Sequence, residues 1–328
     1  MKTVRLGIIG LGYIGQKHLR NGTKLQHAQV LAASDVSRKA LVGAKNAGVR
    51  KTFTDYKQML KDPAIDAVVI GLPTHLHLEC AKAAAEAGKH IFLEKPIARN
   101  VAEAKEIVSV ANKNSIKLMI GYPLRFNKEF CELKNRISDG TLGDVETAHA
   151  LYVGFGPFFH RAEGYAPTPV PEWWFNKELT GGGVLIDLGS HVINLLRWYF
   201  GEISDIKAHF KHRFNMDFED TALCLAKFKN KTTAVINVGW FTQEYGLKVE
   251  LFGSVKHAVA QHAPQNPFKT VVQVIARGRA EFFEPHFSEL EYFVNCLNQD
   301  RNPSPTGQDG IRDMEAIARA YENKIELE

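Results

Sequence analysis

The chain has 328 residues, more than one hydrophobic core usually serves, so two domains are expected. Its composition, 45% hydrophobic and 23% charged, is that of a folded globular protein and excludes a disordered chain. The net charge of +5 is scattered along the sequence, which gives no support to nucleic-acid binding but is compatible with an anionic ligand.

Neither a signal peptide, a membrane span nor a metal site is indicated. Glycines interrupt the apolar start of the chain, which we interpret as a strand and a turn, and no stretch approaches the roughly 20 apolar residues that span a bilayer. The histidine pair His75 and His77 has no carboxylate or thiolate motif nearby. The cysteines lie far apart, without C-x-x-C or metal-ligand spacing: Cys80, Cys131, Cys224 and Cys296. We therefore expect a cytoplasmic protein without a metal or a membrane partner.

Short apolar segments alternate with helical ones in the first part of the chain. Segments rich in Val, Ile and Leu and closed by turn residues predict five strands, at 4–10, 29–35, 66–72, 90–96 and 117–122. Helical stretches lie between them, such as residues 78–90. This alternation predicts an α/β domain over residues 1–122, with a doubly wound parallel sheet covered on both faces.

After residue 122 the pattern changes to that of an α+β domain, expected over residues 123–328. Helices are predicted near 126–139, 181–200, 284–299 and 308–325, and a long irregular segment runs to about residue 177. After a strand that follows the first of these helices, alternating patterns predict further strands at 206–212, 221–228, 232–240, 246–253 and 270–276, with turns at 230–232 and 254–256. The second sheet is therefore expected to be mainly antiparallel.

Gly10, Gly12 and Gly15 form G-x-G-x-x-G directly after the first strand and at the start of a helix. The three glycines permit a tight turn, close approach of the backbone to a pyrophosphate and tight helix packing, and the helix N-terminus supplies N–H donors. In this context the motif predicts a Rossmann dinucleotide-binding domain.

Asp35 ends the second strand, 20 residues after Gly15, where a carboxylate accepts hydrogen bonds from the hydroxyls of an adenosine ribose. This favours NAD, since a 2′-phosphate would meet a like charge. Residues 37–39, Ser-Arg-Lys, leave NADP open because they offer groups that hold a phosphate. Alternatively, or in addition, Asp35 caps the helix that starts near Ser37.

A row of polar residues follows one face of the apolar helix at 181–200: Asp187, Ser190, His191, Asn194 and Arg197. Because ionisable groups are rarely buried in a dry core, we expect this row to face a wet cleft. The glycines at 181–183 would let a ligand or the other domain approach the helix start. The alternative is that His191 is a buried structural histidine with Asp187 as its partner.

Glu94, Lys95 and Pro96 stand at the carboxyl end of a predicted strand. Ligands of open α/β sheets bind outside these strand ends, so Lys95 is expected beside the cofactor, with Pro96 restricting the backbone. The alternative is a solvated loop.

Motifs in this order and spacing resemble the Gfo/Idh/MocA oxidoreductases: the glycine motif, GLPTHLHLECAKAAAEAGKHIFLEKP from residue 71, GYPLRF from 121 and GGGVLIDLGSHVINLLRWYFG from 181. The resemblance spans essentially the whole chain. It implies a Rossmann domain followed by a substrate domain with an open sheet, often used for forming dimers or tetramers. It also implies transfer of a hydride between NAD(P) and a carbinol of a sugar, a cyclitol or a nucleotide-activated sugar.

The resemblance assigns catalytic roles to Lys95, Asp187 and His191. In the expected mechanism neutral His191 accepts the hydroxyl proton, Lys95 stabilises the alkoxide and Asp187 orients His191. We expect the cofactor to be bound by residues of four segments: Gly10, Gly12, Tyr13, Ile14, Gly15, Asp35, Arg38, Pro73, Thr74, His77 and Glu94. The sequence departs from many relatives at two positions, where Thr74 replaces an asparagine and Asn194 an aspartate.

Substrate selection is expected from residues 154–176, which are rich in proline and aromatic residues, and from the polar row. The predicted substrate-binding residues are Arg125, His160, Trp174 and Asn194. The aromatic residues alternatively only pack the segment onto the sheet. Two other functions stay open: a UDP-sugar 3-dehydrogenase and a non-catalytic cofactor-binding regulatory protein, although the latter has no need of the polar row. A homodimer or homotetramer is expected.

Overall fold

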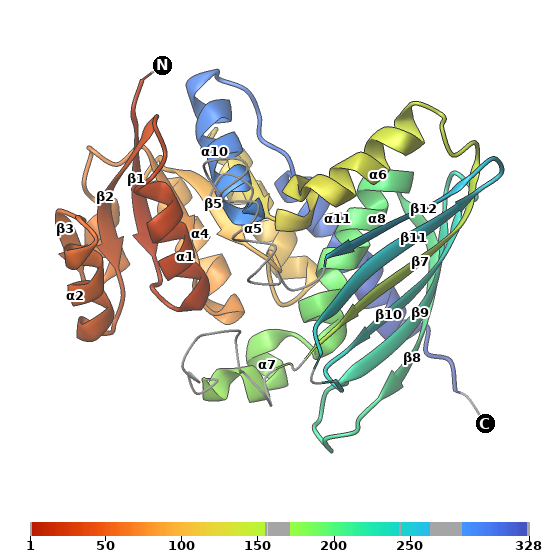
Figure 1. Cartoon of the computed structure of the whole chain (residues 1–328). Helices are drawn as coiled ribbons and strands as arrows, with labels where there is room; N and C mark the ends of the chain where they lie inside the picture. The colour runs from red at the N-terminus through yellow and green to blue at the C-terminus, as the bar shows by residue number, and fades with distance from the viewer. Residues whose placement is uncertain (1, 155, 157–170, 243, 263–283, 327–328) are drawn as a thin grey trace. The chain divides into compact units, whose positions relative to one another are not determined.

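The structure is a computed structural model that describes residues 2–154, 156, 171–242, 244–262 and 284–326 (Figure 1). It consists of two compact units. Unit 1 comprises Met1–Pro123 with Phe282–Ile311, and unit 2 comprises Leu124–Glu281 with Arg312–Glu328. A single cut after residue 122 was expected, so the structure differs in returning a late segment of the chain to unit 1.

Unit 1 contains six parallel strands in the order β3-β2-β1-β4-β5-β6. The strands are β1 (Val4–Ile9), β2 (Ala28–Ser34), β3 (Lys51–Phe53), β4 (Ala67–Ile70), β5 (His90–Glu94) and β6 (Leu118–Gly121). Five were predicted; β3 was missed because it has only three residues and a polar start. The order reverses between β1 and β4, which is the switch point where such sheets bind ligands.

The helices of unit 1 follow its strands in the expected alternation. They are α1 (Tyr13–Gly22), α2 (Arg38–Asn46), α3 (Tyr56–Leu60), η1 (Thr74–Leu76), α4 (His77–Glu86) and α5 (Val101–Lys113), joined by α10 (Pro285–Asn298) from the late segment. α10 returns here because its apolar side packs beside α1 (Figure 1) and places Phe293 edge-on against Phe92 of β5, with ring centroids 5.7 Å apart. The predicted fold class is thus confirmed for this unit.

Unit 2 contains a mixed, mainly antiparallel sheet in the order β12-β11-β7-β10-β9-β8. The strands are β7 (Val145–Val153), β8 (Ile203–Lys211), β9 (Thr221–Phe228), β10 (Thr233–Gly239), β11 (Gly246–Gly253) and β12 (His257–His262), and only the β7–β10 pair is parallel. β12, which starts directly after the predicted turn at 254–256, was not predicted. The strand predicted at 270–276 lies outside the described residues.

The helical elements of unit 2 are η2 (Pro123–Phe126), whose first residue belongs to unit 1, α6 (Lys128–Ser138), η4 (Glu172–Phe175), α7 (Lys177–Thr180), η5 (Leu185–Gly189), α8 (Ser190–Phe200) and α11 (Gly307–Glu322), which begins in unit 1. α6, α8 and α11 lie along one face of the sheet (Figure 1). Small side chains alternate towards this face, as at Ala222, Cys224 and Ala226 of β9.

One stretch of unit 2 requires a correction to the membrane prediction. Lys177–Phe200, 24 residues, is long and apolar enough to span a bilayer by length and composition. However, 67% of its most apolar window is buried inside the protein, as in the core helix of a globular domain.

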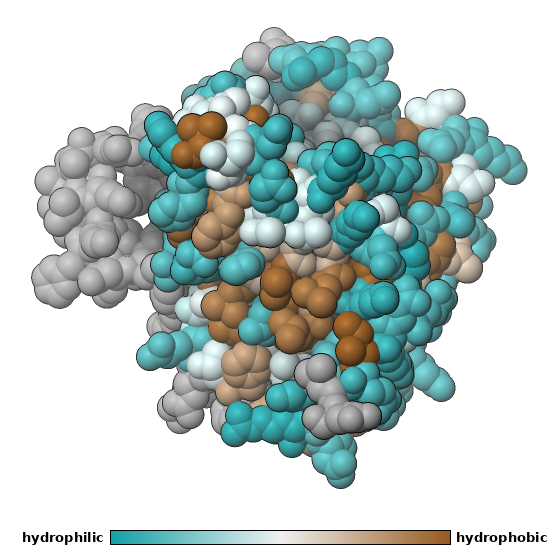
Figure 2. All heavy atoms as spheres, turned by 90° about the vertical axis from the view of Figure 1, so that its right-hand side faces the viewer, coloured by the Kyte–Doolittle hydropathy of each residue, from teal (hydrophilic) through white to brown (hydrophobic). Residues whose placement is uncertain are grey.

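The opposite face of the sheet is apolar in its middle. Figure 2 shows hydrophobic side chains gathered on this side of the molecule, with hydrophilic ones around them. Leu225 of β9 is 54% exposed and pairs in register with Val235 of β10, while Leu223 is 38% and Val259 43% exposed. None of the described helices lies on this face.

Candidate active site

The glycine loop of unit 1 has the geometry that a dinucleotide requires. Gly10 has φ +85°, and a Cβ there would lie 2.6 Å from the carbonyl oxygen of Gly71. A Cβ on Gly15 would lie 1.8 Å from the carbonyl oxygen of Gly10, so helix and loop pack too closely for any side chain. By contrast, a Cβ on Gly12 would meet no described atom within 4 Å, which leaves this side open to a ligand. The residues present therefore fit a pyrophosphate.

Asp35 supports this loop directly. Its carboxylate accepts hydrogen bonds from the backbone N–H of Leu11 at 2.6 Å and of Ser37 at 2.7 Å. The cap of α2 is Ser37, whose hydroxyl accepts from the N–H of Ala40, so the alternative that Asp35 caps this helix is wrong. Arg38 follows and is exposed. Tyr13 and Ile14 begin α1, which has no side-chain N-cap within the described chain and so presents its N–H groups.

His77 joins the two loops that follow β4 and β5. Its ring is 1% exposed, with Nε2 2.9 Å from the carbonyl oxygen of Leu72 and Nδ1 3.0 Å from that of Pro96. Burial lowers the pKa of His77, while the carbonyl groups act in the opposite direction. A buried ring bound to backbone on both sides fixes loops, so His77 positions the neighbouring Pro73 and Thr74.

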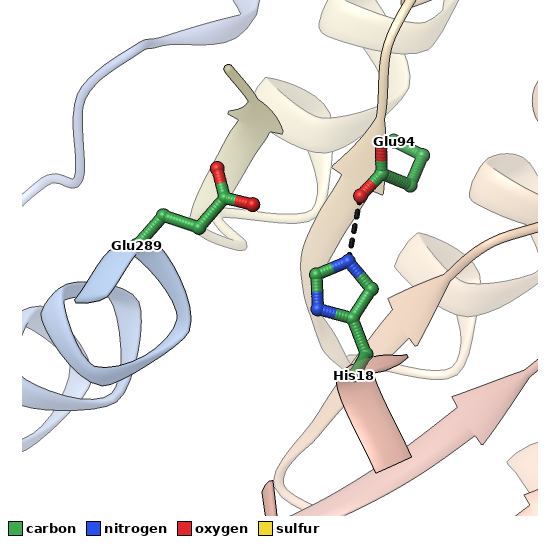
Figure 3. Close-up of side chains that lie close together, drawn as sticks. All are labelled: His18, Glu94 and Glu289. Atoms are coloured by element: carbon green, nitrogen blue, oxygen red, sulfur yellow. Dashed lines mark hydrogen bonds and ion pairs between the residues drawn. The ribbon is translucent and has the colours of Figure 1, made fainter. Parts of the chain in front are cut away.

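The Glu94-Lys95-Pro96 motif divides into a buried part and a half-buried part. Glu94, 6% exposed, points at His18, with Oε1 2.6 Å from Nε2 of the imidazole (Figure 3). Lys95 is half-buried and precedes a cis peptide bond to Pro96. The motif is therefore anchored structure rather than the alternative solvated loop.

The polar row of unit 2 begins in a π-helical turn, Leu185–Gly189, and continues into α8. Asp187 and His191 at this start are half-buried, and His191 lies against Tyr152 of β7, with ring centroids 5.8 Å apart. Such π turns often occur at functional sites. A half-buried carboxylate and imidazole one turn apart are suited to moving a proton.

The glycines at 181–183 serve the protein's own packing. A Cβ on Gly183 would lie 2.0 Å from the carbonyl oxygen of Glu219, and one on Gly182 would lie 2.3 Å from the hydroxyl of Tyr321. The Glu219 carboxylate accepts from the N–H of Leu185 at 2.9 Å and from the Tyr321 hydroxyl at 2.7 Å. Glu219 thus caps the helix that carries Asp187. The prediction that a ligand or another domain approaches these glycines is wrong for Gly182 and Gly183.

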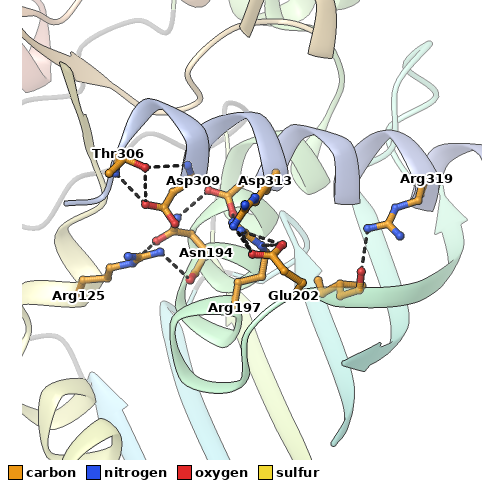
Figure 4. A network of polar contacts seen from close by, with 10 residues as sticks. Arg125, Asn194, Arg197, Glu202, Thr306, Asp309, Asp313 and Arg319 are labelled. Carbon is orange, nitrogen blue, oxygen red and sulfur yellow. Dashed lines mark hydrogen bonds and ion pairs between the residues drawn. The ribbon is translucent and has the colours of Figure 1, made fainter. Parts of the chain in front are cut away.

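The far end of the polar row is buried in an ionic network, contrary to the prediction that the row faces a wet cleft. Asn194 is 1% exposed: Arg125 donates from Nε to its Oδ1 at 2.7 Å, and its Nδ2 donates to Asp313 Oδ2 at 2.6 Å (Figure 4). Asp313 also accepts from Arg197, which pairs with Glu202 at 2.9 Å. Because the Asn194 side chain is buried and both its oxygen and its nitrogen have charged partners, it is not placed to bind a substrate.

The remaining substrate candidates are partly described. Trp174 packs against Trp173 and against Trp240, with ring centroids 5.5 and 6.4 Å away, which supports the packing alternative for this residue. Arg125 is half-buried over the ring of Trp198. His160 lies outside the described residues.

Sequence reasoning missed Glu219, Asp313 and Tyr321, which position the helix of the polar row. Glu219 and Asp313 are 3% and 0% exposed, and burial raises the pKa of the Asp313 carboxyl to about 6, although Arg197 acts to lower it. The sequence signal for Glu219 and Asp313 would have been an acidic residue at a position that the apolar pattern places in the core.

Comparisons with known proteins agree with this architecture. A model described as an oxidoreductase family with an NAD-binding Rossmann fold matches residues 4–122, and a Gfo/Idh/MocA C-terminal domain model matches residues 130–258. The chain is 28% identical to an uncharacterized oxidoreductase, YrbE, of Bacillus subtilis, over 99% of this chain and 95% of the relative. It is 27% identical to a myo-inositol 2-dehydrogenase of Thermotoga maritima, over 99% and 96%.

Solved structures share the whole fold. Scyllo-inositol dehydrogenase from Lactobacillus casei with bound NAD(H) and scyllo-inositol matches with a TM-score of 0.80 at 25% identity, over 98% of this chain and 97% of that one. The WlbA dehydrogenase from Bordetella pertussis, in complex with NADH and UDP-GlcNAcA, has a TM-score of 0.82 at 21% identity, over 98% and 95%. Since the two matching domain models represent both domains of one family and the relatives align end to end, the chain belongs to the Gfo/Idh/MocA family of oxidoreductases, with an NAD-binding Rossmann domain.

Proposed function

We propose that this protein is a dehydrogenase that transfers a hydride between NAD and a carbinol of a cyclitol or sugar. The observation that carries the proposal is the half-buried Asp187 and His191 pair at a π-helical turn, in a chain whose other unit has an open glycine loop for the dinucleotide. Relatives named inositol 2-dehydrogenases, similar over nearly the full chain, support the substrate class.

The cofactor is held by the residues of unit 1. The N–H groups at the start of α1 and the open side of Gly12 would hold the pyrophosphate, and Asp35, which accepts from the glycine loop, would also accept from the adenosine ribose. NAD is favoured over NADP because a 2′-phosphate would approach the Asp35 carboxylate. Bound NAD supplies a hydride acceptor at C4 of its nicotinamide ring.

The chain's own residues move the proton. Neutral His191 accepts the proton of the substrate hydroxyl, the general-base role that histidine most often has in enzymes. The Lys95 ammonium stabilises the developing alkoxide, and Asp187 orients the imidazole and binds a neighbouring hydroxyl. In the reverse reaction His191 returns the proton.

A labelled-substrate screen tests this proposal. Purified protein is incubated with NAD or NADP and panels of inositols, free sugars, sugar acids and UDP-sugars, and reduction is followed by absorbance. For an active substrate, deuterium at the carbinol carbon is expected to appear at C4 of the reduced nicotinamide. NAD reduction with inositols or free sugars supports the proposal.

The same screen decides between the other functions. Activity confined to UDP-sugars would replace the proposal by a nucleotide-sugar dehydrogenase, for which the fold-level likeness to WlbA is the specific observation. Tight NAD binding without turnover of any panel would indicate a non-catalytic cofactor-binding protein.

We also propose a cytoplasmic location. All four cysteines are free thiols, as expected in a reducing cytoplasm.

We also propose that the apolar face of the unit 2 sheet pairs with another copy of this chain, as a homodimer or within a homotetramer. Exposed Leu223, Leu225 and Val259 on a sheet face are typical of an interface (Figure 2). Light scattering after gel filtration should give the mass of two or four chains, and Leu225→Asp should shift it towards the monomer. A monomeric wild-type protein would contradict this.

A further inference from the structure

Three ionisable side chains from distant parts of the sequence meet inside unit 1. His18 comes from α1, Glu94 from the end of β5 and Glu289 from α10, and they are 0%, 6% and 0% exposed (Figure 3). One ligand-capable atom from each lies within 4.8 Å of the others. No spacing motif joins residues 18, 94 and 289, so this cluster arises only from the fold.

Glu289 is the unusual member of the cluster. Within the described chain, neither of its carboxylate oxygens has a hydrogen-bond partner, although both are buried. Figure 3 shows the carboxylate directed towards the space beside His18 and Glu94. Leaving a buried carboxylate without partners costs several kcal/mol, roughly the penalty of an unpaired buried charge. A positive group between the three side chains would remove this cost.

The neighbouring basic residue is already engaged. Lys17 lies 3.1 Å from Glu284, whose carboxylate also contacts Asn21 at 2.9 Å and His286 at 2.7 Å. This leaves the imidazole of His18, which contacts Glu94, facing two carboxylates. A single charge on His18 balances only one of them.

We propose that His18, Glu94 and Glu289 bind a divalent transition-metal ion, Zn²⁺ or Mn²⁺, that fastens α10 to the Rossmann sheet. Two ligand atoms bound to one such ion at 2.0–2.2 Å lie up to about 4.4 Å apart, so the observed cluster closes on an ion after small side-chain rotations. Neither oxygen of Glu289 makes a hydrogen bond within the described chain that could take the place of such an ion. One imidazole and two carboxylates without thiolate form a donor set that suits these ions.

The ion has a structural task that does not depend on the proposed reaction. α1 starts at the glycine loop, and Glu94 directly precedes Lys95. A metal bridge to α10 fixes both elements from within unit 1. It would add to the apolar packing of α10 and to the contact of Phe293 with Phe92.

Metal analysis of the full-length, tag-free protein tests the proposal. We expect about one equivalent of Zn²⁺ or Mn²⁺ per chain, removal of which by a chelator lowers the Tm and re-addition of which restores it. The Glu289→Gln variant, which preserves shape, should retain less than about a tenth of an equivalent and lose the response to chelator and metal. Glu291→Gln, on the exposed side of the same helix, is the matched control and should behave like the wild type.

The opposite result is equally distinct. Wild-type protein that contains no metal, and whose Tm is unchanged by added Zn²⁺ and Mn²⁺, overturns the proposal. So does a Glu289→Gln variant that is as stable as the wild type or more stable, because it would show that Glu289 is neutralised by a proton. These measurements need no substrate, so they are independent of the dehydrogenase assay.

Discussion

The two ends of the polar row in unit 2 have similar residues and opposite surroundings. At the start, Asp187 and His191 are half-buried at a π-helical turn; at the far end, Asn194 and Arg197 are buried and bound to Asp313. Spacing along a helix predicts which side chains share a face. It does not predict whether solvent or another charged residue covers that face.

Replacing His191 should have the largest effect, because the start of the row is where we place the chemistry. His191→Ala is expected to lower kcat by about 10²- to 10⁴-fold while the Kd for NADH stays within about twofold. His149→Ala, at an exposed position of β7, is the matched control. An unchanged kcat in His191→Ala would show that the start of the row, like its far end, has no catalytic role.

At the far end the prediction concerns stability. Asn194→Asp places a second carboxylate 2.6 Å from Asp313, where the amide now donates a hydrogen bond. We expect a loss of about 3 kcal/mol in the free energy of unfolding, as for a disrupted buried ionic pair, measured by urea titration.

A second substitution provides the control for this loss. Asn194→Asp combined with Asp313→Asn again places one carboxylate and one amide between the same arginines, so most of the stability should return. A double variant no more stable than Asn194→Asp would show that the contact between residues 194 and 313 does not account for the lost stability.

The glycines allow the same comparison between a ligand-facing and a protein-facing position. Gly183→Ala, with a Cβ 2.0 Å from the Glu219 carbonyl oxygen, should lower stability by about 2–4 kcal/mol. Gly12→Ala, with open space around it, should leave the Tm unchanged and weaken NADH binding by at least about tenfold, roughly 1.4 kcal/mol. A Gly12→Ala variant that binds NADH normally would refute the assignment of the open side to the dinucleotide.

Much of the fold could be predicted from local pattern. Five of the six strands of the unit 1 sheet were predicted, because apolar runs and turn residues are local signals. β3 was too short to give such a signal. The surroundings of the polar row and of Gly183 could not be predicted, because Asp313 and Glu219 lie far away in sequence. The return of α10 to unit 1 likewise depends on contacts with α1 and β5 that no local pattern contains.

The smallest effects concern two aspartate–arginine pairs that differ in burial. Asp66 accepts from Arg5 Nε at 2.9 Å and Nη2 at 2.8 Å, and these hydrogen bonds lower its pKa to about 2. Asp313, in the sealed network with Arg197, has its pKa raised by burial from an ordinary 3.8 to about 6.

The two shifts give opposite pH dependences in separate windows. The folded state holds the Asp66 proton less tightly than the unfolded state, so its contribution is complete above about pH 4 and is lost towards pH 2. Partial exposure limits this contribution to about 1 kcal/mol. The folded state holds the Asp313 proton more tightly, so its contribution declines as the pH rises from about 4 to about 6.

Urea unfolding from pH 2 to 7 should therefore show that Asp66→Asn removes a slope in the free energy of unfolding only below about pH 4, and Asp313→Asn only above it. Slopes of the same sign in both windows would mean that burial does not outweigh the Arg197 charge at Asp313.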